Sequence, residues 1–96
     1  MEGFLGKKSP SVLAGWQDRF LVLEDGKLRW FKSNQEKDLA VPEGVINMEH
    51  FEIILEIPND NPDGLHFNLR FNGIGERIFE FRAKTREDAE EWQLEL

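Results

Sequence analysis

Apolar and polar residues alternate along most of the first 83 residues, with the period of two that places successive side chains on opposite faces of a β-strand. The clearest alternation flanks Glu24-Asp25-Gly26, where a glycine after an aspartate supplies the positive φ that tight hairpin turns need. We therefore predict a β-hairpin over residues 16–32. Seven strands are predicted in all, over residues 3–8, 16–23, 27–32, 45–48, 51–57, 65–71 and 77–83.

The period changes after residue 84. Ala89, Trp92 and Leu96 recur at the spacing of one helical face, and Thr85 followed by acidic residues is typical of a helix N-terminus. We predict an amphipathic helix from about residue 85. The sequence reaches Leu96 without a capping residue, which is typical of a helix that continues further. A single domain over residues 1–96 is expected, in which this helix plugs a barrel of antiparallel strands and Trp92 forms the plug.

Two strand positions place polar or aromatic side chains on the core-facing side of the hairpin. Arg19 shares a face with Leu21 and Leu23, and Trp30 shares a face with Leu28. If the leucines form the core, both side chains point inward near an open end of the barrel. A cation there is costly to bury unless water or an anion meets it, so this mouth is the first place to look for a ligand.

Composition and charge narrow the possible partners. The chain has no cysteine, which suits the cytosol, and no apolar run approaches the roughly 18 residues of a membrane span. Its net charge of −7 argues against a general nucleic-acid binder. Residues 1–37 carry seven basic against five acidic residues (+2), whereas residues 38–96 carry five against fourteen (−9). This dipole could present a basic end to an anionic surface, or both halves could be ordinary solvated surface.

The loop before the hairpin, residues 9–15, has an apolar centre. Val12 and Leu13 stand where polar residues are usual, between basic positions on either side. One interpretation is a membrane wedge, in which this tip enters the headgroup region. The alternative is that Val12 or Leu13 folds back onto the domain.

The segments GFLGKK, WQDRFLVL, KLRWFKS, EGVINM and TREDAEEW with its Trp92 occur in an order and spacing that resembles a pleckstrin homology domain. The resemblance covers essentially the whole chain. It implies a mainly β fold: a seven-stranded barrel of two roughly orthogonal antiparallel sheets, of four and three strands, capped by the C-terminal α-helix.

The resemblance also implies a function. Many members of the family bind phosphoinositide headgroups at the open end, through a lysine at the end of the first strand and an arginine in the second. Lys7 and Arg19 match these positions, and Trp30 stands where members often have a pocket-lining tyrosine. An arginine fork suits phosphate. The candidate headgroup-binding residues are Lys7, Lys8, Arg19, Trp30 and Lys32.

Three residues depart from the family's binding pattern. Gln17 replaces the middle basic residue of the second strand, Asp18 follows it, and Glu43 falls near a position that is arginine in high-affinity relatives. We therefore expect weak to moderate binding of phosphoinositide or other anionic lipid, by a cytoplasmic signalling adaptor module at the membrane surface. The alternative is a protein-interaction scaffold with little or no lipid binding.

The sequence offers little for other classes of function. No nucleophile is paired with a base and no carboxylates converge, so we do not expect an enzyme. His50 and His66 are isolated, with no spacing typical of a metal site, and no metal or cofactor is expected.

Overall fold

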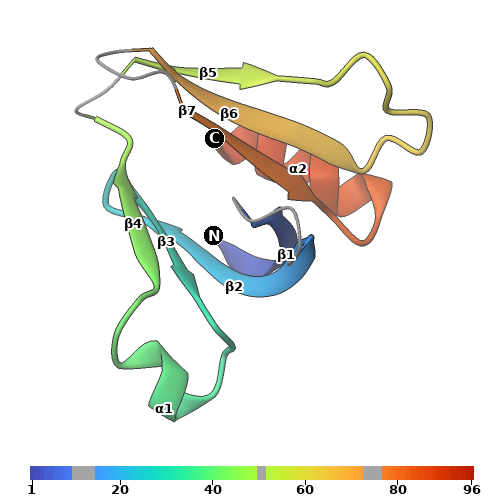
Figure 1. Ribbon diagram of the computed structural model, residues 1–96. Helices are drawn as coiled ribbons and strands as arrows, with labels where there is room; N and C mark the ends of the chain where they lie inside the picture. Colours follow the sequence, from blue (N-terminus) through green and yellow to red (C-terminus); the bar gives the residue numbers. More distant parts are fainter. Residues whose placement is uncertain (10–14, 50–51, 73–76) are drawn as a thin grey trace.

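A computed structural model describes residues 1–9, 15–49, 52–72 and 77–96 (Figure 1). The predicted mainly β fold with a C-terminal helix is confirmed. No strand end differs from the expected one by more than one residue. The elements are β1 (Glu2–Lys8), β2 (Trp16–Glu24), β3 (Lys27–Phe31), α1 (Glu36–Leu39), β4 (Gly44–Asn47), β5 (Glu52–Glu56), β6 (His66–Asn72), β7 (Arg77–Arg82) and α2 (Arg86–Glu95).

Hydrogen bonds join the seven strands into one antiparallel sheet in the order β4-β3-β2-β1-β7-β6-β5. The link between β1 and β7 is short, with only Gly6 opposite Arg82 and Lys7 opposite Phe81. Figure 1 shows that the sheet folds over at this link, so that β1–β4 and β5–β7 form two layers. The two predicted sheets of four and three strands are thus the two halves of one bent sheet.

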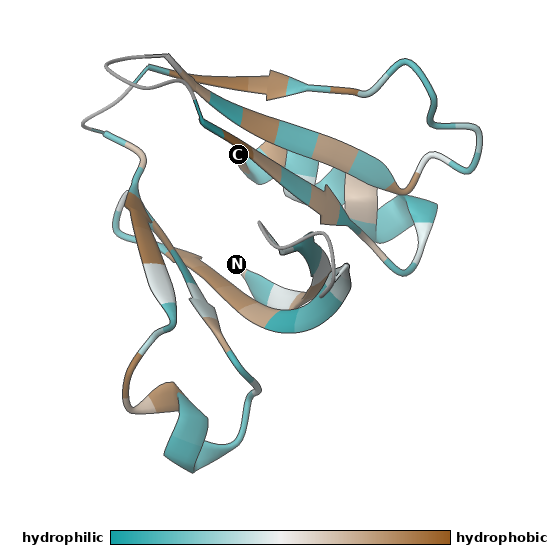
Figure 2. Cartoon of the chain, in the orientation of Figure 1, coloured by the Kyte–Doolittle hydropathy of each residue, from teal (hydrophilic) through white to brown (hydrophobic). Residues whose placement is uncertain are grey.

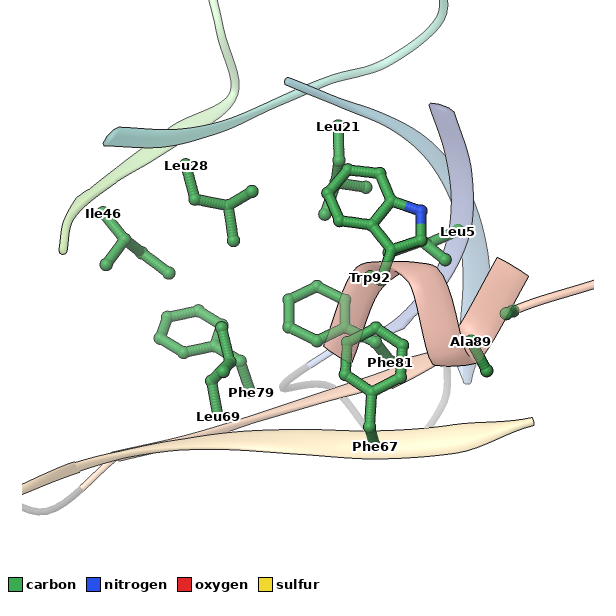
Figure 3. Packing of buried hydrophobic residues seen from close by; sticks show 11 residues of the cluster. Leu5, Leu21, Leu28, Ile46, Phe67, Leu69, Phe79, Phe81, Ala89 and Trp92 are labelled. Carbon is green, nitrogen blue, oxygen red and sulfur yellow. The ribbon is translucent and has the colours of Figure 1, made fainter. Parts of the chain in front are cut away.

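The core lies between the two layers. Alternate positions of β6 and β7 are apolar, as the colouring of β6 in Figure 2 shows, and their inward side chains meet leucines from β1, β2 and β3. Burial of these side chains is the main favourable term that holds the layers together. Figure 3 shows the packing of the largest members, which include Leu5, Leu21, Leu28, Phe67, Leu69, Phe79 and Phe81.

Helix α2 covers one end of this core. The Thr85 hydroxyl caps it by accepting a hydrogen bond from the backbone N–H of Asp88 at 3.1 Å. Ala89 and Trp92 are buried, and the Trp92 indole lies among the core side chains in Figure 3. The predicted helix and its plug are confirmed. Within the described residues, neither helix has the length and apolarity needed to cross a membrane.

Two local features differ from the sequence predictions. The connection after β3, predicted as irregular, contains α1, where Ser33 donates to Asp38 at 2.6 Å and accepts from the backbone N–H of Gln35 at 3.0 Å. Four residues with no buried side chain give no apolar periodicity, so the pattern could not predict this helix. Ile57, predicted as the last residue of the fifth strand, lies beyond the end of β5 and is exposed.

Candidate functional site

A pocket of about 280 Å³ lies at the end of the barrel where β1 finishes and β2 begins. The β1–β2 register sets Leu5 opposite Arg19 and Lys7 opposite Gln17, so the two cations share the face of the buried Leu5. The pocket is the mouth that the alternation of the hairpin predicted. Its lining residues are Lys7, Ser9, Gln17, Arg19, Trp30, Glu43 and Arg77.

Arg19 is held by three acceptors. Its Nε lies 2.5 Å from Glu43 Oε1, one terminal nitrogen donates to Gln17 Oε1 at 2.9 Å, and the other donates to the backbone carbonyl of Asp18 at 2.8 Å. The backbone N–H of Glu43 in turn donates to the carbonyl of Trp30 at 2.8 Å, which fixes the carboxylate near the guanidinium. Arg19 is therefore positioned inside the pocket, with its charge already met by a carboxylate.

Lys7 lies between two aromatic rings. Its Nζ is 5.0 Å from the Trp30 ring centroid and 5.4 Å from the Phe79 centroid, which are distances for cation–π attraction. Burial lowers the pKa of Lys7, as do the positive charges of Arg77 and Arg19, and the Glu43 carboxylate opposes the shift. This ammonium is partly removed from water and lies near two other cations, so an incoming anion would find its charge only partly compensated.

Arg77, the first residue of β7, was not predicted as part of the site. Its guanidinium carbon lies 4.3 Å from the Phe79 ring centroid, and its side chain lines the pocket. The signal was available in the sequence, because residues 77, 79 and 81 fall on one face of the predicted strand and two of the three are phenylalanines, which are typical of a core. With Lys7, Arg19 and Glu43, it gives the pocket three cations and one carboxylate, a formal charge of +2.

The structure brings together Lys7, Arg19 and Trp30 of the five predicted headgroup residues. Lys8 points to the opposite face of β1 and forms an ion pair with Glu80 at 3.5 Å. Lys32 is exposed beyond the end of β3 and does not line the pocket. The proposed wedge, Val12 and Leu13, lies outside the described residues.

The pocket is lined by three cations, one carboxylate and the neutral side chains of Ser9, Gln17 and Trp30. Across the described ranges, no three histidine, cysteine, aspartate or glutamate side chains gather in a way that could hold a metal ion. What the side chains can do is bind an anion through two cations that share the Phe79 ring, with Trp30 as an apolar wall 5.6 Å from that ring.

The protein-family model of the PH domain matches residues 1–95. The chain is 31% identical over 98 residues to human oxysterol-binding protein-related protein 10, and 29% identical over 90 residues to human pleckstrin homology domain-containing family A member 6. These matches cover 100% and 94% of the chain, but it spans only 12% and 8% of the two relatives.

Solved structures share the fold. Crystal structures of the Slm1 PH domain in complex with D-myo-inositol-4-phosphate and in complex with phosphoserine are each 25% identical to this chain, with TM-scores of 0.74 and 0.75. Each match covers 96% of this chain and 86% of the Slm1 chain.

Proposed function

This chain belongs to the PH domain family, and from that premise we propose that it is a membrane-targeting module. Its pocket at the β1–β2 end binds the headgroup of a phosphoinositide or another anionic phospholipid, with weak to moderate affinity. The observation that carries the proposal is that Lys7 and Arg77 both line the pocket and both lie against the Phe79 ring. Cations that lie against an aromatic ring have less side-chain freedom to lose when they meet a phosphate than unrestrained ones.

The relatives support a ligand that contains phosphate. The Slm1 PH domain has been crystallised with an inositol phosphate and with phosphoserine, and a phosphate group is common to both. A phosphate at Lys7 and Arg77 would also offset the repulsion and the loss of hydration that lower the pKa of Lys7. The first line of support concerns the chemistry of the ligand, and only the second concerns this pocket.

Glu43 limits the affinity that we expect for a headgroup. A headgroup with several phosphates would bring further negative charge toward a carboxylate that already pairs with Arg19. The added phosphates and the Glu43 carboxylate would repel each other, so the pocket is not suited to tight recognition of a triply phosphorylated headgroup.

The remaining candidate residues from the sequence can add to membrane binding. We propose that Lys8 and Lys32 attract the membrane surface as peripheral charges, and that Val12 and Leu13 enter the headgroup region as a wedge. Their contribution would depend on ionic strength for the lysines and on apolar burial for the wedge. A module of this kind would act at the cytoplasmic face of a membrane, as part of a signalling or adaptor protein.

A second candidate is a protein-interaction module with little lipid binding. The observation that favours it is the Arg19–Glu43 pair, because the arginine that would bind phosphate in related domains is already engaged by a carboxylate. The two candidates predict different responses to loss of the pocket cations. In neither does the domain act as an enzyme.

Liposome sedimentation tests the proposal. Vesicles of phosphatidylcholine with a phosphatidylinositol phosphate should bind the wild-type chain, and a Lys7→Ala/Arg77→Ala variant should lose at least about tenfold in affinity for them. A Lys37→Ala/Arg86→Ala variant is the matched control, since it removes two exposed cations that do not line this pocket.

The control should bind almost as well as the wild type. An equal loss of vesicle binding in both double variants would mean that binding depends only on the overall charge of the domain. That result would contradict a defined pocket. A partner protein that is captured equally by wild type and by Lys7→Ala/Arg77→Ala, with no binding of either chain to the vesicles, would select the protein-interaction module instead.

A further inference from the structure

The pocket lining presents charges of both signs. Lys7 and Arg77 both lie against the Phe79 ring, and no ion pair joins either to another residue in the described ranges. Glu43 pairs with Arg19, and its backbone N–H donates to the carbonyl of Trp30. A ligand that fills the pocket therefore meets a carboxylate and two cations that form no ion pair within the described part of the chain.

Glu43 keeps the capacity to accept further hydrogen bonds. One carboxylate oxygen pairs with Arg19, and 42% of its side chain remains exposed. An ionised carboxylate has about four acceptor positions, so the pairing with Arg19 leaves several open. A phosphate placed there would be repelled, whereas an ammonium would be attracted by the same group.

Resting on the function proposed above, we propose that the pocket selects a headgroup that combines a phosphate with a free amine and still carries a net negative charge. Phosphatidylserine has this chemistry, with its phosphate at Lys7 and Arg77 and its ammonium at Glu43. The net positive charge of the pocket requires the remaining carboxylate of the serine headgroup, since phosphatidylethanolamine would supply an amine without net charge. The spare donor of the Gln17 amide and the remaining N–H groups of Arg19 line the same space and can meet that carboxylate.

The same geometry distinguishes the lipid from a phosphorylated protein. A phosphoserine residue inside a peptide has its amine in an amide bond, so it brings no ammonium to Glu43. Its phosphate would contact Lys7 and Arg77 without using Glu43. The proposed ligand is therefore the lipid headgroup or its soluble form, glycerophosphoserine.

Vesicles of matched surface charge provide the test. Phosphatidylserine and phosphatidylglycerol each carry one net negative charge, so vesicles with equal fractions of either in phosphatidylcholine differ in headgroup chemistry and not in charge. We expect the wild type to bind phosphatidylserine vesicles about three- to tenfold more tightly than phosphatidylglycerol vesicles. Glu43→Gln removes the carboxylate charge and should abolish this preference, with binding to phosphatidylglycerol unchanged or stronger. Glu36→Gln, an equal charge change on α1 outside the pocket, should keep the preference.

Soluble competitors distinguish a lipid headgroup from a phosphorylated peptide as the ligand. Glycerophosphoserine should shift the NMR signals of the pocket residues at lower concentration than glycerophosphate or an N-acetylated phosphoserine peptide. Equal shifts by the peptide and by glycerophosphoserine would overturn the role of the amine.

The failure of this inference is distinguishable from the failure of the proposed function. Equal binding to the two vesicle types, or a preference that persists in Glu43→Gln, overturns the selection of an amine and leaves the anion pocket standing if Lys7→Ala/Arg77→Ala still loses binding. Absence of wild-type binding to phosphatidylserine, phosphatidylglycerol and phosphoinositide vesicles alike overturns both.

Discussion

The indole of Trp30 lies directly over Gly44, its register partner on the neighbouring strand β4. A Cβ built at position 44 would overlap the six-membered part of the ring. Glycine is therefore required at this position by close approach of a side chain, not by an unusual φ. Because the same indole walls the pocket and packs 5.6 Å from Phe79, the absence of a side chain at residue 44 helps to set the shape of the site.

Gly44→Ala should destabilise the domain by about 1–3 kcal/mol, the usual cost of forcing a methyl group into an occupied space. It should also change the tryptophan fluorescence, because the Trp30 ring must move. Chemical denaturation followed by fluorescence measures both. Gly3→Ala is the matched control, since its Cβ would make ordinary contact with Trp92 at 3.7 Å, and it should be neutral or stabilising by up to about 1 kcal/mol. Equal costs for the two variants would contradict this account.

The period of two predicted the position of Lys7, Arg19 and Trp30 because alternation across a strand is fixed by backbone geometry. Once Leu5, Leu21 and Leu28 are assigned to the core, the neighbours two residues away on the same strand must point to the same side. The same argument, carried to β7, would have added Arg77, two residues before the buried Phe79. The mouth of the barrel was thus predictable from the pattern alone.

The pairing of Arg19 with Glu43 was not predictable from alternation. It depends on where the chain re-enters the sheet after β3, and therefore on the short helix α1, which has no apolar face. The sequence indicated that Glu43 lies near the site, but not that its carboxylate contacts Arg19. Long-range contacts of this kind are decided by the path of the connections, and local residue patterns carry little information about that path.

Trp92→Ala should destabilise the domain more than any other substitution proposed for this chain. The side chain is almost fully buried and covers one end of the core, so its loss should cost about 3–5 kcal/mol, a large part of the 5–15 kcal/mol typical of a small domain. Urea denaturation gives the free energy of unfolding. Trp16→Ala, which removes an equally large but half-buried ring that contacts Arg82 and His66, should cost about 1 kcal/mol. A similar loss in both would argue against Trp92 as the plug.

Lys7 should give the domain a measurable pH dependence. Its pKa is lowered below the usual 10.5 in the folded state, so the unfolded chain binds more protons between the two pKa values. The free energy of unfolding should therefore rise with pH across that interval and should stop rising above 10.5. At pH values below the folded-state pKa, Lys7 is charged in both the folded and the unfolded chain, and its charge lowers the free energy of unfolding by the full amount.

Lys7→Met should consequently raise the free energy of unfolding at neutral pH and flatten its rise toward pH 10.5. A series of urea denaturation curves at increasing pH measures both effects. Lys8→Met, on the exposed face of β1, should keep the wild-type slope and change stability by less than about 0.5 kcal/mol. A slope in Lys7→Met that equals that of the wild type would contradict the prediction.

The Arg19–Glu43 pair should show a coupling free energy that the Lys8–Glu80 pair lacks. In the first pair the atoms are 2.5 Å apart and the Arg19 side chain is 20% exposed, whereas in the second the atoms are 3.5 Å apart and both side chains are at least 40% exposed. Because solvent screens both pairs, we expect a coupling of about 0.5–1 kcal/mol for Arg19–Glu43 and close to zero for Lys8–Glu80. Double-mutant cycles with glutamine at all four positions measure these values, and added salt should reduce the larger one. Equal couplings would mean that the ion pair at the pocket wall is no stronger than a surface contact, and Glu43 would then compete less effectively with a bound phosphate.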